Sequence, residues 1–215
     1  MEQVNLYPVC LKLEGQRCLV VGGGKVAQRK VGGLKECGAL IFLVSPEITP
    51  KLAQAAGRGE FQYFRRGFEA CDLEGMRVVI AATDNKALNE QIARMCEERG
   101  ILVNVADNPA LSTFFVPAHF HRGPLCISVS TGGRSPLLAR RIREFLQSEI
   151  GPEFGDLALL LGTLRERTQT SIPDQFRRQK IFEKILTEDF VRLLKTGNKD
   201  LLKEQVEACL SLPLE

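Results

Sequence analysis

The chain has 215 residues, of which 44% are hydrophobic and 26% are charged. This composition is typical of a folded globular protein and excludes a disordered or collagen-like chain. Lysine and arginine outnumber aspartate and glutamate by 29 to 26, giving a net charge of +3. So small a net charge excludes a protein that coats nucleic acid through a strongly basic surface.

The amino terminus lacks the basic and then apolar run of a secretion signal, and no apolar stretch is long enough to span a bilayer. The seven cysteines are odd in number, widely spaced and without a C-x-x-C pair. That spacing disfavours a disulfide scaffold or a zinc knuckle and fits reduced thiols. We therefore expect a cytoplasmic protein with no membrane or nucleic-acid partner.

Short apolar runs alternate with longer amphipathic stretches in the first half of the chain, the pattern of a parallel sheet covered by helices. We expect strands at residues 17–21, 40–44, 61–64, 78–82 and 101–105, and helices at 25–37, 49–56 and 86–98. Residues 8–13 are a candidate for an extra strand. The first half therefore predicts an α/β domain.

After residue 109 the pattern changes. Two extended runs, 113–120 and 125–130, flank a turn at 121–124. Ser135 followed by Pro136 predicts a helix start, because serine caps helices and proline fits their first turn. We expect this helix to reach about residue 150, with a buried face formed by Leu138, Ile142, Phe145 and Leu146. From residue 151 onward the sequence reads as helical, with interruptions at 151–152, 170–173 and 196–198.

A glycine-rich turn joins the first predicted strand to the first predicted helix. Gly22, Gly23 and Gly24, followed by Lys25, Val26 and Ala27, form the pattern G-x-G-x-x-A. Such a turn brings the backbone close to a pyrophosphate, which the N–H groups and dipole of the helix attract. The alternative is a tight turn without a ligand, but the strand before it and the helix after it favour nucleotide binding.

The end of the second predicted strand should hold the adenosine ribose. An acidic residue is usual at this place, whereas here the sequence is Ser45-Pro46-Glu47. Ser45 or Glu47 can bond a ribose hydroxyl, and no arginine lies beside them to hold a 2′-phosphate. We therefore expect NAD rather than NADP. Thr83, after the fourth strand, lies at the same edge, and both nucleotide binding and helix capping by Thr83 and Asp84 stay open.

The fifth predicted strand contains Asn104 and is followed by Asp107, and both should reach the crevice at the carboxyl edge of the sheet. A carboxylate beside a hydride acceptor can serve as the base in a dehydrogenation. By itself, however, the sequence Asp-Asn-Pro favours a simple Asx-type turn.

The two histidines, His119 and His121, are two residues apart. Such a pair can bind a metal, but no further ligand lies nearby in the sequence, so we expect no metal site. The motifs of nucleophile-elbow hydrolases, HExxH zinc proteases and Walker A nucleotide-triphosphate enzymes are absent.

One stretch is locally basic. Between His121 and Arg143 the sequence contains no acid and five arginines, at positions 122, 134, 140, 141 and 143. Thr131 and Gly132 belong to a loop at a helix N-terminus in this stretch, an arrangement that suits capture of carboxylates or phosphates. Arg134 and Arg141 fall on one helix face, whereas Arg140 and Arg143 fall on another. A solvated helix face is an equally good interpretation.

In combination, these motifs resemble the precorrin-2 dehydrogenase module of siroheme biosynthesis. The resemblance covers nearly the whole chain, weakens after about residue 150, and rests on Tyr7-Pro-Val, Gly22-Gly-Gly-Lys-Val-Ala-Gln-Arg-Lys30, Ala81-Ala-Thr-Asp84, Asn104-Val-Ala-Asp107 and Ser130-Thr-Gly-Gly-Arg-Ser-Pro-Leu-Leu-Ala-Arg140.

The resemblance implies an NAD-dependent oxidation of precorrin-2, a tetrapyrrole with eight carboxylates, to sirohydrochlorin. It implies that Asp107 is catalytic and that nucleotide contacts fall on residues 22–26, on 45–47 and near Thr83. From the strand end and the basic stretch we further expect Asn104, Thr131, Gly132, Arg134 and Arg141 to face the substrate. Fused siroheme synthases carry a phosphorylatable serine where this chain has Thr131. Some relatives also insert iron into sirohydrochlorin; a bifunctional dehydrogenase and ferrochelatase, or a non-catalytic NAD-sensing module, are the alternatives.

The resemblance also implies the organisation of the chain. It predicts a Rossmann-type NAD-binding domain at residues 1–112, a central dimerisation region at 113–150 and a small all-helical domain at 151–215, assembled as a homodimer. The methyltransferase domain of fused siroheme synthases is missing from this sequence, so we expect a separate methyltransferase to supply precorrin-2.

Overall fold

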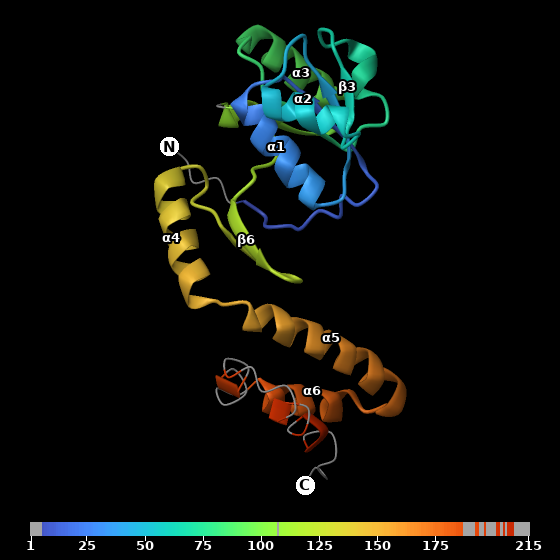
Figure 1. Ribbon diagram of the computed structural model, residues 1–215, viewed down its shortest axis with the longest axis vertical. Helices are drawn as coiled ribbons and strands as arrows, with labels where there is room; N and C mark the ends of the chain where they lie inside the picture. Colours follow the sequence, from blue (N-terminus) through green and yellow to red (C-terminus); the bar gives the residue numbers. More distant parts are fainter. Residues whose placement is uncertain are drawn as a thin grey trace. The chain divides into compact units, whose positions relative to one another are not determined.

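The computed structural model describes residues 6–106 and 108–186, together with residues 192–193, 196, 201–202, 204 and 206–208. The chain divides into two compact units, Met1–Val116 and Pro117–Glu215 (Figure 1). The three-part division at residues 112 and 150 stays a prediction. Among the described residues, none of the helices combines the length and apolar character that crossing a membrane requires.

The first unit is built on a five-stranded parallel sheet with the strand order β3-β2-β1-β4-β5. Its strands are nearly all apolar because helices cover both faces of the sheet. The order reverses between β1 and β4, and such a reversal is where open α/β sheets bind their ligands. This arrangement confirms the predicted Rossmann-type fold. The strands are β1 (Arg17–Val21), β2 (Leu40–Val44), β3 (Gln62–Phe64), β4 (Val78–Ala81) and β5 (Leu102–Val105).

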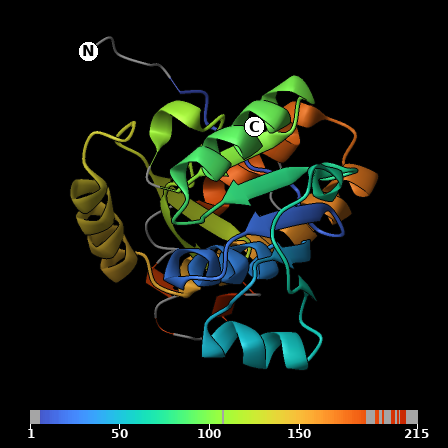
Figure 2. The same ribbon diagram turned by 90° about the horizontal axis from the view of Figure 1, so that it is seen from above.

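Helices cover both faces of the sheet (Figure 2). Helices α1 (Lys25–Glu36) and α2 (Pro50–Gly57) contribute to the core on one face, and α3 (Lys86–Glu98) contributes to the core on the other. Between β3 and β4 the chain forms only a short 3-10 helix, η1 (Ala70–Leu73).

The free edge of β5 is covered by the segment that follows it. After the 3-10 helix η2 (Pro109–Leu111) the chain returns beside β5, and the Thr113 N–H donates to the Val103 carbonyl at 2.9 Å. The Ser112 hydroxyl accepts from the Val105 N–H at 2.9 Å. The predicted extra strand at residues 8–13 is wrong, because residues 6–13 join neither sheet.

The second unit begins with an antiparallel hairpin of β6 (Ala118–Arg122) and β7 (Leu125–Val129), followed by α4 (Pro136–Glu149). Helices α5 (Glu153–Ser171) and α6 (Gln175–Ile185) then pack around a separate core, with buried Leu157, Leu164, Ile181, Ile185 and Val206. The predicted interruptions at 151–152 and 170–173 fall where helices meet. Of the interruption at 196–198, residues 197 and 198 lie outside the described residues.

The predicted buried face of α4 is wrong. Ala139 is the buried residue of this helix, and Leu138, Ile142 and Phe145 are exposed, with 62% of Phe145 accessible. Leu137, next to the predicted face, is 66% accessible. The amphipathic pattern does identify a face that favours burial, but within this chain that face points away from the hairpin on which α4 packs.

Candidate functional site

The glycine-rich turn leads directly from β1 into α1, and its first two glycines are required by close packing. Gly22 has a φ of +118°, and a Cβ there would lie 2.2 Å from the Ala82 carbonyl oxygen. A Cβ on Gly23 would lie 1.8 Å from the Glu47 carbonyl oxygen. The loops that follow β2 and β4 therefore pack directly against the turn, which brings three strand ends together.

Gly24 differs from its two neighbours, because a Cβ at this position would meet no atom within 4 Å. Gly24 is the N-cap of α1, and neither a side-chain cap nor an acidic residue in the first turn is present. The backbone N–H groups of Lys25 and Val26 begin the helix beside this open space. Unpaired N–H groups, a helix dipole and room for close approach are what a pyrophosphate requires, so the residues present fit a dinucleotide.

The loop after β2 is held by one hydrogen bond within it and one from β3. The buried Ser45 hydroxyl donates to the Glu47 carbonyl at 2.6 Å, and the Tyr63 hydroxyl donates to the Ser45 carbonyl at 3.0 Å. Ser45 thus shapes the loop, while Pro46 and the Glu47 carboxylate are exposed. Of the predicted ribose contacts, Glu47 is the better placed, because its carboxylate can accept hydrogen bonds from ribose hydroxyls.

Thr83 lies at the end of β4 and is fixed by Asn89, which the sequence analysis missed. The Thr83 hydroxyl donates to the Asn89 Oδ1 at 2.7 Å, and the buried Asn89 returns a hydrogen bond from Nδ2 to the Thr83 carbonyl at 2.9 Å. The cap of α3 is Asn85, whose side chain accepts from the Leu88 N–H at 3.1 Å. The capping role considered for Thr83 and Asp84 therefore belongs to Asn85.

Asn104 is turned into the protein rather than left free for a ligand. It is 7% exposed, its Oδ1 accepts from the Lys30 ammonium at 2.8 Å, and its Nδ2 donates to the Phe114 carbonyl at 3.1 Å. Burial, with a smaller contribution from Arg29, lowers the pKa of Lys30. The substrate contact of Asn104 stays a prediction, and Asp107 lies outside the described residues.

The arginine-rich stretch is less uniform than its sequence indicates. Arg122 donates to the Ile150 and Gln147 carbonyls, each at 2.9 Å, and so caps the end of α4. Arg140, Arg141 and Arg143 all lie near Glu144, which follows the acid-free stretch directly, at 2.8, 3.6 and 3.5 Å. The hydrogen bond from Arg140 is the main reason that the pKa of Glu144 is lowered.

Arg134 is the exception in this stretch. It is exposed, and within the part of the chain that the structure describes its guanidinium has no hydrogen-bond or ion-pair partner. It follows Gly132 and Gly133, which have φ values of +60° and +79°, and the Thr131 hydroxyl accepts from the Ser135 N–H at 3.0 Å. This loop presents one unpaired guanidinium at the start of α4.

His119 and His121 share the exposed face of β6, with ring centroids 5.6 Å apart. His119 Nδ1 lies 3.0 Å from the Pro117 carbonyl. Across residues 6–106, 108–186 and the short described pieces beyond, no group of three or more His, Cys, Asp or Glu side chains is arranged to hold a metal ion.

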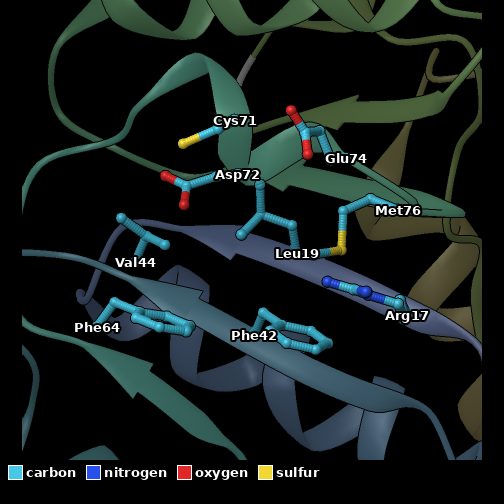
Figure 3. A pocket seen from close by; sticks show the side chains of 9 residues that line it. All are labelled: Arg17, Leu19, Phe42, Val44, Phe64, Cys71, Asp72, Glu74 and Met76. Carbon is cyan, nitrogen blue, oxygen red and sulfur yellow. The ribbon is translucent and has the colours of Figure 1, made fainter.

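A pocket of about 210 Å³ lies away from the glycine turn, on the face of the sheet where η1 replaces a helix. Figure 3 shows Phe42 and Phe64 on one side of it and Asp72 and Glu74 on the other. Burial would raise the pKa of Asp72, but hydrogen bonds from Arg66 keep it below its usual value. None of the predicted site residues lines this pocket, so it is not the nucleotide site.

Three family models match successive parts of the chain. Residues 9–118 match a family model described as putative NAD(P)-binding. Residues 122–149 match the sirohaem biosynthesis protein central region, and residues 153–210 match the sirohaem synthase dimerisation region.

Named relatives agree with these matches. A siroheme synthase from Thioalkalivibrio sulfidiphilus is 39% identical over 99% of this chain and 43% of its own length. One from Methylococcus capsulatus is 41% identical over 85% of this chain and 39% of its own length. The chain thus spans less than half the length of these curated relatives.

A solved structure described as SirC, precorrin-2 dehydrogenase, is 27% identical to this chain. It superimposes with a TM-score of 0.76 over 94% of this chain and 100% of its own. Together with the three family models, the match confirms the resemblance and the use of an NAD(P)-type cofactor. The chain belongs to the NAD(P)-binding family of sirohaem biosynthesis proteins, with the NAD(P)-binding, central and dimerisation regions of that family in order.

Proposed function

We propose that the protein oxidises precorrin-2 to sirohydrochlorin with NAD as the hydride acceptor. The observation that carries this proposal is the open Gly24 position at the start of α1, at the strand-order reversal of a chain that matches the whole of a solved precorrin-2 dehydrogenase. In this proposal residues 22–26 hold the pyrophosphate. Ser45, Pro46 and Glu47 border the adenosine ribose, and Thr83 lies beside them.

The exposed Glu47 carboxylate supports NAD rather than NADP. A carboxylate accepts hydrogen bonds from ribose hydroxyls, whereas it repels a 2′-phosphate. The bound dinucleotide supplies a hydride acceptor. The oxidation removes one hydride and one proton from the tetrapyrrole, and we assign the proton to the Asp107 carboxylate as base.

The substrate is a polycarboxylate, and the loop before α4 supports its capture. Arg134 has no partner among the described residues, and a guanidinium can bond a carboxylate through two parallel hydrogen bonds. Arg141 lies 3.6 Å from Glu144 and is 75% exposed, so the ion pair leaves it accessible. Thr131 and Gly132 shape the loop. We assign these four residues to the substrate side of the site, and a substrate contact of Asn104 stays a prediction.

We further propose that the protein acts as a homodimer in the cytoplasm. The match to a dimerisation region supports the assembly, and so does the exposed apolar face of α4, formed by Leu137, Leu138, Ile142 and Phe145. Apolar clusters left on a surface usually mark an interaction site. Cys10, Cys18, Cys37, Cys71 and Cys96 carry free thiols, which fits a reducing compartment.

The experiment for this function is to mix the protein with enzymatically prepared precorrin-2 and NAD. NADH is followed by the absorbance of its reduced nicotinamide, and the tetrapyrrole by its absorption spectrum. We expect NADH and sirohydrochlorin in equal amounts, slower turnover with NADP, and a fall in kcat of at least ~100-fold in Asp107→Ala with NAD affinity retained. Folded protein that binds NAD without oxidising precorrin-2 would overturn the proposal.

A further inference from the structure

Side-chain hydrogen bonds join the segments that precede and follow Asp107 in the sequence. The chain leaves β5 at Val105 and returns at Ser112, whose hydroxyl accepts from the Val105 N–H at 2.9 Å and lies 3.2 Å from the Asn108 carbonyl. One residue further along, the Thr113 hydroxyl accepts from the Val103 N–H at 2.9 Å. The two segments, the departing and the returning stem, are thus joined mainly by hydroxyl groups rather than by a regular ladder of backbone hydrogen bonds.

Asn104, in β5, links this strand both to the returning segment and to α1. Its Nδ2 donates to the Phe114 carbonyl on the returning stem, while its Oδ1 accepts from Lys30 on α1. The orientation of the amide is therefore set by Lys30, because the ammonium has only donors and needs the oxygen on its side. We call this pair of hydrogen bonds the Lys30–Asn104 clasp.

Lys30 is a charged residue on the side of α1 that faces the core, where apolar residues are usual. On α1 it lies between the core positions Ala27, Val31 and Leu34, on the side of the helix that packs against the sheet. A lysine there is half-buried, and burial lowers its pKa. A methylene chain of similar length without the charge would avoid that desolvation cost. The ammonium is therefore better explained by the contact it makes than by the packing of the helix.

We propose that Lys30 is a positioning residue for the dehydrogenation: through Asn104 it fixes the returning stem and thereby residues 108–112, which directly follow Asp107 in the sequence. The inference rests on the proposed function. It makes Lys30 act on the rate of proton removal rather than on nucleotide affinity, because the clasp joins β5 and its return segment to Lys30 on α1 and includes no residue of the glycine turn.

The test compares Lys30→Met with Lys30→Arg. Lys30→Met keeps the aliphatic chain and removes the donor, and we expect kcat to fall about 10- to 100-fold, the usual effect of a misplaced reacting group. The KM for NAD should stay within about twofold, since the pyrophosphate site is untouched. Lys30→Arg keeps a donor for the single acceptor Oδ1 and should recover kcat to within roughly threefold of the original protein.

Lys35→Met is the matched control, because Lys35 is on the same helix but its ammonium contacts Glu60 at the surface. Its kcat should equal that of the unmodified protein. Hydrogen–deuterium exchange provides a readout that needs no substrate: the amides of Val103, Val105 and Thr113 should exchange faster in Lys30→Met, while those of β1 are unchanged.

Each of three outcomes would overturn the positioning role. They are an unaltered kcat in Lys30→Met, unaltered exchange at these three amides, and a Lys30→Arg variant as slow as Lys30→Met. If the unmodified protein does not oxidise precorrin-2, the proposed function fails. The exchange measurement still decides whether the clasp holds the returning stem.

Discussion

At the scale of single residues, glycine occupies the three consecutive positions of the turn for different physical reasons. Gly22 and Gly23 have no room for a Cβ because carbonyl oxygens of Ala82 and Glu47 press against them. Gly24 has room for a side chain, so packing within the protein does not explain why glycine stands there. A ligand that approaches the backbone does explain it.

This difference gives a matched pair of substitutions. Gly24→Ala should fold with an unchanged melting temperature, because φ is −79° and the added methyl meets nothing, but should bind NAD at least ~10-fold more weakly. Gly23→Ala should lose ~1–3 kcal/mol of folding stability, as overpacked sites do. Calorimetric titration with NAD and thermal melts measure both effects. Unweakened NAD binding in Gly24→Ala would place the pyrophosphate elsewhere.

Other residues at the site could not be identified from the sequence. Asn89 and Lys30 each hold a site loop, yet in the sequence each is one polar residue within an amphipathic helix. The signal that the sequence does offer is their position. Each is a polar residue on the helix face that the neighbouring apolar residues assign to the core. Their partners lie 6 and 74 residues away, and no local pattern connects residues at the longer distance.

At the scale of elements, the parallel sheet and its helices were predictable because buried strands are continuous apolar runs and each helix has one apolar face. The prediction of a strand at residues 8–13 was wrong, since an apolar run does not reveal whether a sheet edge is free. The stretch 113–120 was predicted as one extended run, but only its last three residues belong to β6. Its beginning lies beside β5 through the Thr113 hydrogen bonds.

Helix α4 was predicted in extent but not in the direction of its apolar face. Periodicity defines which residues share a face of the helix. Which part of the protein, or of a partner subunit, packs against that face depends on tertiary and quaternary contacts. The arginines show the same limit, because Glu144 neutralises several of them from just outside the stretch that the charge count defined.

The apolar face of α4 gives a test at this scale. Phe145→Asp places a charge at the centre of the face without touching buried Ala139, so the monomer should keep its fold. We expect the sedimentation coefficient to change from that of a dimer to that of a monomer at micromolar concentration, since unpaired charges are excluded from interface cores. Arg140→Asp, on a different face of α4, is the control. A dimer of unchanged stability in Phe145→Asp would place the interface elsewhere.

At the scale of the whole molecule, two buried thiols make folding stability depend on pH. Burial raises the pKa of Cys18 from 9.0 to about 11, with a smaller contribution from Cys37, and burial likewise raises that of Cys96 to about 11. Between these values the unfolded chain loses the two protons while the folded protein keeps them. The free energy of unfolding therefore falls as pH rises from about 9 to about 11.

Urea unfolding at pH 8 and pH 10.5 measures this loss. Because lysines and tyrosines also titrate in this range, the comparison is with the double variant Cys18→Ala and Cys96→Ala, whose stability should decline less steeply. Equal slopes for the two proteins would show that the thiols are ionised in the folded state as readily as in the unfolded one.

The return of the chain beside β5 also affects how the molecule behaves among its own copies. An open sheet offers two edges to which a strand from another chain can add, and such additions start aggregation. Here one edge is covered by residues 112–114, and the other is β3, which has only three residues. A foreign strand therefore finds little backbone to pair with at either edge of this five-stranded sheet.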